Sequence, residues 1–271
     1  MVLDYKKILN LNFIQRTLTI LFLFPIIIFC IYNGNYWSKS LIIIFSILIS
    51  NEWFSLTQKK KIYLNKIIFI NLVLFNIFFS FFLYFPFSIL LTIFISFFYT
   101  FKLRVRKYVI GSNNKWLFYG FLYISIPFLI FIQIDNLNNG KIILLWFLAI
   151  VFSTDIFSYI FGNLIKGPKV FPLISPSKTY AGTILGIFFG TTSGIIFSLK
   201  FLNITQLPNL IIFSLLISSS ALFGDLLVSK IKRLFNVKHS GNLLPGHGGF
   251  LDRFDSIAYS IIILFFLVHF I

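Results

Sequence analysis

The sequence predicts an all-α protein with about nine transmembrane helices. Of its 271 residues, 58% are hydrophobic and 20% are aromatic, and the mean hydropathy is +0.95. Only 11% of the residues are charged, whereas soluble domains average about 25%. Long apolar runs recur along the chain, and in lipid a helix satisfies its own backbone groups. The single cysteine, Cys30, excludes an internal disulfide framework and a multi-cysteine metal site.

The apolar runs divide into segments of the length that crosses a bilayer, which is about 20 residues. The run from Ile67 to Phe101 carries no charge and is long enough for two spans, which we separate near Pro86. The predicted spans are 17–34, 41–56, 67–84, 86–101, 117–134, 142–161, 183–199, 210–227 and 257–271. We expect no cleavable signal peptide, soluble domain or internal repeat, so residues 1–271 form one integral membrane domain.

The net charge of +16 fits the orientation of a membrane protein better than a nucleic-acid-binding surface, and we expect no nucleic acid partner. The basic residues stand in short loops between apolar runs, not in a basic stripe of a soluble domain. With a cytoplasmic N-terminus, all of the 23 Lys and Arg residues face the cytoplasm except Lys39, Lys141 and Lys200. Cytoplasmic loops are enriched in Lys and Arg. Nine spans therefore predict a cytoplasmic N-terminus and a C-terminus on the opposite side.

The seventh predicted span carries glycines at four-residue spacing, at Gly182, Gly186, Gly190 and Gly194. Small residues on one face let membrane helices approach closely. We interpret this stripe as a packing surface, with access of lipid to the site as the alternative.

The first polar segment runs from Asp155 to Thr179. A carboxylate inside a span is costly and is a functional candidate by default, so Asp155 is a candidate; pairing with Lys166 or Lys178 is the structural alternative. The segment ends in a proline turn surrounded by hydroxyl and ammonium groups, which suits phosphate binding or a helix N-cap. These candidate groups are Ser175, Ser177, Lys178 and Thr179.

The second polar segment follows the eighth span, in which Ser218, Ala221 and Asp225 share one helix face. Positive charge comes next, at Ser229-Lys230-Ile231-Lys232-Arg233 and at Lys238. Glycines and acids close the segment in the run Pro245-Gly246-His247-Gly248-Gly249-Phe250-Leu251-Asp252-Arg253-Phe254-Asp255. Only seven acids exist in the chain, and three of them lie in or beside this segment.

This combination predicts a site for a magnesium-bound nucleotide. Glycines allow backbone to approach a ligand, and Lys and Arg supply positive charge for a polyphosphate. Magnesium is usually held by one or two carboxylates plus substrate phosphates. The alternatives are an anionic-lipid-binding or topogenic role for the basic run, a structural role for His247 and a tight turn for the glycines. None of these explains why the acids gather here.

The motif residues resemble the phosphatidate cytidylyltransferase family, also called CDP-diacylglycerol synthases. The matching positions of the closing motif are Ser229, Lys232, Arg233, Lys238, Pro245, Gly246, His247, Gly248, Gly249, Asp252, Arg253 and Asp255. Asp155, Tyr159 and Gly162 match an upstream Asp-x-x-x-Tyr-x-x-Gly element, and 175–179 match a Ser-Pro-x-Lys-Thr element. The resemblance covers about 100 residues, and residues 1–150 match only in having several spans. It implies N-terminal helices in 1–150 and a catalytic half in 151–271.

The resemblance implies transfer of CMP from CTP to phosphatidic acid, giving CDP-diacylglycerol and pyrophosphate. It assigns magnesium, with two ions expected and a monovalent cation as a further candidate, to Asp225 and Asp252, with Asp255 beside them. The groups expected to contact the phosphates are Lys178, Lys232, Arg233, Lys238, His247 and Arg253. The further substrate-binding candidates are Asp155, Ser175, Ser177, Thr179, Ser229, Gly248 and Gly249.

Three positions depart from the family pattern. His239 stands where an Asp is typical, Val228 where a Glu often precedes Ser, and Ala181 where Glu or Gln is common. Each change removes a polar or acidic group, which would weaken metal binding if one of those acids holds a second ion. Asp225, Asp252 and Asp255 remain, so we expect activity to survive.

The resemblance implies a multi-pass protein of the bacterial inner membrane with its active site on the cytoplasmic face. The expected partners are CTP, phosphatidic acid and the bilayer, with a homodimer as the candidate assembly. Three other functions stay open at this point. They are a related CTP-dependent enzyme acting on a polyprenol or an ether lipid, a transporter, and an inactive relative.

Overall fold

The computed structural model describes residues 11–58, 63–105, 114–202, 207–241, 243 and 248–268. Nine α-helices occupy most of this part of the chain. They are α2 (Leu11–Asn33), α3 (Tyr36–Thr57), α4 (Tyr63–Ser80), α5 (Phe85–Val105), α6 (Asn114–Asp135), α7 (Gly140–Ile165), α8 (Tyr180–Phe201), α9 (Leu207–Leu234) and α10 (Leu251–Leu267). Each helix overlaps one predicted span, which confirms the all-α prediction.

Six of the described helices are long and apolar enough to cross a membrane: Tyr36–Thr57, Tyr63–Ser80, Lys115–Asp135, Gly140–Ile165, Tyr180–Phe201 and Pro208–Leu234. Two shorter apolar stretches, Phe22–Asn33 and Phe85–Phe101, belong to α2 and α5. The protein is therefore a multi-pass membrane protein. Which side of the membrane each terminus occupies stays a prediction.

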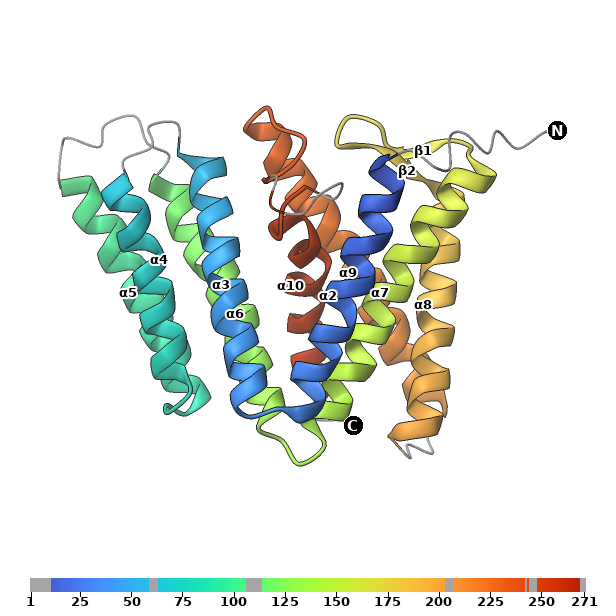
Figure 1. Ribbon diagram of the computed structural model, residues 1–271, viewed down its shortest axis with the longest axis horizontal. Helices are drawn as coiled ribbons and strands as arrows, with labels where there is room; N and C mark the ends of the chain where they lie inside the picture. Colours follow the sequence, from blue (N-terminus) through green and yellow to red (C-terminus); the bar gives the residue numbers. More distant parts are fainter. Residues whose placement is uncertain are drawn as a thin grey trace.

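The helices run up and down between two ends of the molecule (Figure 1). A short antiparallel β-hairpin, β1 (Lys169–Phe171) and β2 (Ser175–Thr179), lies at one end, which we call the hairpin end. This hairpin was not predicted, because two short strands that contain Pro176 and polar residues lack the alternation typical of a strand. It connects α7 to α8 and places the Ser175–Thr179 segment over the ends of the helices.

Two helix boundaries differ from the sequence prediction in a way that changes the site. The predicted eighth span ends at 227, but α9 continues to Leu234, so Lys232 and Arg233 lie on a helix. The predicted ninth span begins at 257, but α10 begins at Leu251. Charged residues lower the hydropathy of both stretches, which is why the spans were placed too short. The segment that we predicted as one loop is therefore two helix ends joined by a shorter connection.

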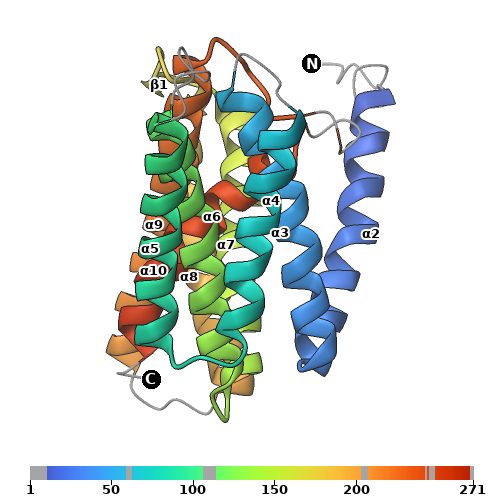
Figure 2. The same ribbon diagram turned by 90° about the vertical axis from the view of Figure 1, so that its left-hand side faces the viewer.

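The helices form two groups with α10 between them (Figures 1 and 2). Helices α3 to α6 pack together on one side, and α7, α8 and α9 pack together on the other. Helix α10 contacts α9, α6, α7 and α3, so it links both groups. It also begins deeper in the molecule than the hairpin-end tips of α3 and α9 (Figure 1).

The glycine stripe of α8 is a packing surface, as the sequence predicted. All four of its glycines are buried. A Cβ at Gly186 would collide with the hydroxyl of Ser158 on α7, and one at Gly190 would collide with the side chain of Thr154. The hydroxyls of Thr154 and Ser218 lie 2.8 Å apart beside the stripe, which joins α7 to α9. Close approach of α8 therefore depends on the missing side chains.

Gly190→Leu is expected to destabilise the protein by about 1–3 kcal/mol, since overpacking a filled interface displaces both neighbouring helices. A thermal unfolding series in detergent would measure a lower midpoint. Thr192→Leu is the matched control, because position 192 lies on the opposite side of the same helix and is only partly buried. Equal midpoints for the two variants would contradict the packing role.

Candidate active site

Acids and lysines from four elements gather below the hairpin. The group consists of Asp155 on α7, Lys178 on β2, Asp225 and Lys232 on α9, and Asp252 and Asp255 on α10. Asp255 lies close enough to Asp155, Asp225, Lys232 and Asp252 for each of them to interact with its charge. Lys178 interacts in the same way with Asp225. The two motif segments predicted from the sequence therefore meet in one charged cluster.

Asp225 lies where α9 and α10 touch. A Cβ on the preceding residue, Gly224, would lie 2.5 Å from the carbonyl oxygen of Asp255, so the glycine lets the two backbones approach. The Asp225 carboxylate pairs with the Nζ of Lys178 at 2.7 Å and accepts a longer hydrogen bond from Ser229 Oγ at 3.3 Å. It also lies close enough to the Asp255 carboxyl for the two charges to interact. The hairpin lysine is thus held against the bundle through Asp225.

Asp252 is the most completely engaged carboxylate of the cluster. Its Oδ1 accepts a 2.8 Å hydrogen bond from Lys232 Nζ, and its side chain is only 7% exposed. Its Oδ2 accepts from the backbone N–H groups of Ser240 at 3.2 Å and Gly249 at 3.1 Å. The Nδ1 of His239 lies 3.7 Å from the same oxygen. Asp252 therefore ties α9, the connecting segment and α10 together, and His239 lies next to it.

Among the described residues, no lysine forms an ion pair with Asp155. Its carboxylate accepts a 2.9 Å hydrogen bond from Ser256 Oγ on α10. The structural alternative of an ion pair with Lys166 or Lys178 is wrong for the described residues, because Lys178 pairs with Asp225. Asp155 is therefore part of the acidic cluster, and a hydroxyl is its nearest partner.

Several polar residues of the hairpin and its neighbourhood are engaged in contacts that hold the local structure. Thr179 Oγ1 accepts from the backbone N–H of Gly182 at 3.1 Å, which makes it the N-cap of α8. Ser175 is buried, and its hydroxyl lies 3.5 Å from that of Ser177. Arg233 donates to the backbone carbonyls of Ile174 and Val237, so it braces the hairpin turn against the segment after α9.

The other predicted positions surround the cluster. Gly248 has a φ of +88°, and a Cβ there would lie 2.5 Å from the Oδ2 of Asp252. Gly249 is buried, while Lys238 and Arg253 are exposed to approaching ligands. His247 and its neighbours Pro245 and Gly246 lie outside the described residues, so their predicted roles stay predictions.

Glu52 on α3 is a site residue that the sequence interpretation missed. It is 2% exposed, and its carboxylate accepts three hydrogen bonds from the segment around the start of α10. The donors are Ser240 Oγ at 3.0 Å, the backbone N–H of Phe250 at 3.0 Å and that of Leu251 at 2.9 Å. A Cβ at Gly249 would collide with the same carboxylate. Glu52 therefore holds the turn that precedes Asp252.

The position of Glu52 has a clear physical basis. The first N–H groups of a helix have no partner within the helix, and Phe250 provides no side-chain cap for α10. A carboxylate at a helix N-terminus accepts these N–H groups and interacts favourably with the helix dipole. The available signal was its charge within the predicted span 41–56, since a charge at that depth marks a functional candidate.

The acids of the cluster suit magnesium, although they do not form a complete metal site without further ligands. Within the described ranges, no three His, Cys, Asp or Glu side chains are arranged to hold a metal ion by themselves. Magnesium usually takes one or two carboxylates, with the remaining ligands from water and phosphate. The partly buried Asp225 and the buried Asp255 repel each other, and a hard cation held by the acids of the cluster would offset that repulsion. The donor set therefore fits magnesium.

The fold and the site define a multi-pass membrane enzyme scaffold whose buried and partly buried acids and lysines meet near the hairpin. The chain belongs to the cytidylyltransferase family, whose model matches residues 14–271. The family was expected from the motifs of the C-terminal half, and the match extends through the N-terminal helices as well.

Curated relatives agree with the family. The phosphatidate cytidylyltransferase of Rickettsia bellii (strain RML369-C) is 41% identical over 167 residues, covering 58% of this chain and 70% of that protein. The phosphatidate cytidylyltransferase of Bacillus subtilis (strain 168) is 39% identical over 152 residues, covering 54% of this chain and 55% of that protein. That of Helicobacter pylori (strain J99 / ATCC 700824) is 35% identical over 155 residues, covering 56% of each.

Proposed function

We propose that this protein is a phosphatidate cytidylyltransferase, which transfers CMP from CTP to phosphatidic acid and releases pyrophosphate. The observation that carries the proposal is the joining of the two motif segments in one cluster, through the Lys178–Asp225 and Lys232–Asp252 pairs. Family membership and the names of the relatives support the same reaction.

The reaction forms one bond and breaks one bond. A phosphate oxygen of the lipid attacks the α-phosphorus of CTP, and the bond from that phosphorus to the β-phosphate oxygen breaks. The electron pair leaves with pyrophosphate. Such a transfer needs positioning and charge neutralisation more than a covalent nucleophile. The lipid phosphate is already ionised near neutral pH, so no strong general base is required.

The lysines of the cluster are placed to supply that charge. Lys178 and Lys232 are paired with carboxylates in the structure. Lys238 and Arg253 follow these residues in the motif segments and are exposed. Arg233 has two backbone carbonyl partners, so its main contribution is to hold the hairpin. In this proposal Lys178 and Lys232 exchange their carboxylate partners for substrate phosphates.

Magnesium belongs to the same proposal. Asp225 and Asp252 would hold it, with Asp255 next to them. We expect two magnesium ions, and a monovalent cation is a further candidate. When bound, the metal neutralises the charge on the attacking and leaving oxygens. Before substrate binds, the carboxylates orient Lys178 and Lys232, since each lysine lies less than 3 Å from one of them.

His239→Asp is expected to lower the magnesium concentration for half-maximal activity by about tenfold, the size of effect typical of groups around a metal site. The reason is position: His239 lies 3.7 Å from Asp252, and an aspartate would add a carboxylate there. Asn236→Asp is the matched control, because it adds the same charge to an exposed position of the same segment. A magnesium titration of CTP transfer measures both, and equal shifts would contradict the specific effect.

We further propose that the hairpin end faces the cytoplasm of a bacterial inner membrane. The lysines that the sequence predicted on the opposite side, Lys39, Lys141 and Lys200, lie on the helix ends far from the hairpin, at the starts of α3 and α7 and the end of α8. Loops rich in Lys and Arg stay in the cytoplasm, where CTP is present. A homodimer stays a prediction, which the mass of the purified protein–detergent complex would test.

The proposed function predicts a lipid product. Purified protein incubated with radiolabelled CTP, phosphatidic acid and magnesium should give label that extracts into organic solvent as CDP-diacylglycerol. Labelling of the lipid at the same rate without divalent metal would contradict the magnesium proposal. Absence of any labelled lipid, with correctly folded protein, would contradict the function.

A panel of lipid acceptors separates the proposal from the related enzymes. Phosphatidic acid should be the preferred acceptor over a polyprenol or an ether lipid. Transport is disfavoured because the described charged cluster is joined to the hairpin at one end of the helices, through the pair of Lys178 with Asp225. An inactive relative predicts no product with any acceptor, so the same panel tests it.

A further inference from the structure

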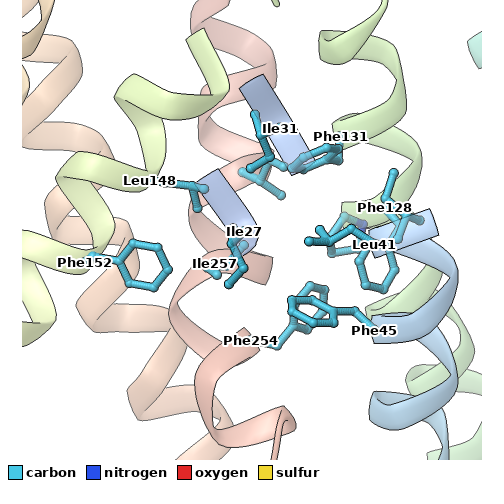
Figure 3. A pocket seen from close by; sticks show the side chains of 13 residues that line it. Ile27, Ile31, Leu41, Phe45, Phe128, Phe131, Leu148, Phe152, Phe254 and Ile257 are labelled. Atoms are coloured by element: carbon cyan, nitrogen blue, oxygen red, sulfur yellow. The ribbon is translucent and has the colours of Figure 1, made fainter. Parts of the chain in front are cut away.

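An apolar pocket lies inside the bundle beneath the charged cluster. Its walls come from five helices, α2, α3, α6, α7 and α10, and the described residues that line it are all apolar. Figure 3 shows Ile27 and Ile31 of α2 between Leu148 and Phe152 on one side and Phe45 and Phe128 on the other. Such a surface offers nothing to a nucleotide or a phosphate, but it suits hydrocarbon.

Residues that line the pocket are neighbours, along α7 and α10, of residues in the charged cluster. On α7, Phe152 lines the pocket and Asp155 lies one helical turn nearer the hairpin end on the same face, which is about 4.5 Å along the axis. On α10, the lining residue Ile257 follows Ser256, the hydrogen-bond partner of Asp155. A molecule with a phosphate in the cluster would therefore reach the pocket with the carbon chain attached to it.

Helix α2 forms the outer wall of the pocket. It packs chiefly on α3 and α7, and it stands at the edge of the bundle in the side view (Figure 2). The volume of the pocket is about 40 Å³. A hydrocarbon chain that enters it must move α2 outward or turn the phenylalanine side chains, and a helix with so few packed neighbours is the wall that yields most easily.

We propose that this pocket holds an acyl chain of the lipid substrate, with α2 as the movable wall that admits it. The inference rests on the proposed function, which supplies a phosphate attached to two acyl chains. The phosphate lies among Lys178, Lys232 and Arg253, and one acyl chain extends past the Asp155–Ser256 pair into the apolar space below. The pocket therefore discriminates lipids by chain length, while the charged cluster recognises the headgroup.

Filling the pocket tests the proposal. Ile27→Trp is expected to raise the KM for a long-chain phosphatidic acid about tenfold, the effect of displacing roughly two methylene groups from an apolar site. The KM for CTP and the turnover of a water-soluble short-chain phosphatidic acid should stay unchanged. Ile26→Trp is the matched control, since Ile26 is the neighbouring residue on α2, is 54% exposed and does not line the pocket. Equal KM values for the two variants would overturn the proposal.

A second measurement uses the unaltered protein and does not depend on the folding of a variant. Phosphatidic acid with a photoreactive diazirine near the end of one acyl chain should label peptides of α2, α7 and α10 that contain the lining residues. Excess unlabelled phosphatidic acid should remove this labelling. A phosphatidylcholine probe of the same chain should label only the exposed face of α2, such as Ile26 and Phe29.

The outcomes separate this inference from the proposed function. Equal labelling of the pocket by the phosphatidylcholine probe would mean that bulk lipid fills it, and labelling of exposed positions alone would mean that no chain enters; either result overturns the inference. Failure of CMP transfer to every phosphatidic acid would overturn the proposed function instead, and the labelling pattern can be read without any transfer.

Discussion

Glu52→Ala is expected to reduce CTP transfer by about 100-fold or more, although position 52 lies in the N-terminal helices. The variant removes the acceptor for Ser240 and for the backbone N–H groups of Phe250 and Leu251. Each unsatisfied buried donor costs about 1–3 kcal/mol, so the turn before Asp252 would reorganise. A shift of about 1 Å in a catalytic group can lower a rate by that amount.

The Glu52 variants also need a measurement that reports on the turn itself. Hydrogen–deuterium exchange should accelerate for residues 248–255 in Glu52→Gln, because the amide presents a donor to one of the backbone N–H groups. Exchange in α4 and α5 should stay as in the unaltered protein. Glu52→Asp keeps the charge and should recover part of the activity. Uniformly faster exchange throughout the helices would indicate general unfolding and contradict a positioning role.

Asp252→Asn is expected to lower the turnover number by about 100- to 1,000-fold, a loss typical of removing one preorganised charge from an active site. The asparagine is nearly isosteric, but it leaves the ammonium of Lys232 without its 2.8 Å partner. If the amide oxygen faces Lys232 instead, the amide nitrogen faces the backbone N–H groups of Ser240 and Gly249, which both need an acceptor. Steady-state assays with radiolabelled CTP measure the change.

The matched control for Asp252→Asn is Asp135→Asn, at the end of the molecule opposite the hairpin. Asp135 accepts a 2.6 Å hydrogen bond from Ser38 and lies far along α6 from the charged cluster. This variant should keep its activity. Full activity of Asp252→Asn, with the unfolding midpoint unchanged, would contradict the assignment of Asp252 to the reaction and to magnesium.

The helices could be predicted from the sequence because one physical requirement dominates them. A span in lipid must be apolar over its length, and its backbone must be satisfied internally. All nine described helices follow from that rule. It fails where a helix carries charge, as at Lys232 on α9 and Asp252 on α10, because these stretches are stabilised by ion pairs at the site.

The candidate site could be predicted where its residues stand in one motif. Asp225, Lys232 and Asp252 were found in this way, and so was Lys178. Glu52 could not be found from a motif, because its partners are backbone N–H groups as far as 199 residues away in the sequence. The hairpin that carries Lys178 was missed because its strands are short and are ordered by Thr179 and Arg233.

The contact between Glu52 and α10 also bears on how the protein is made. Glu52 leaves the ribosome 198 residues before Phe250, an interval of about 10–40 s at bacterial synthesis rates. Throughout that interval its carboxylate lacks these donors, and burial of a carboxylate without partners is costly. The turn that precedes Asp252 therefore gains its Glu52 contacts only after the start of α10 has been synthesised.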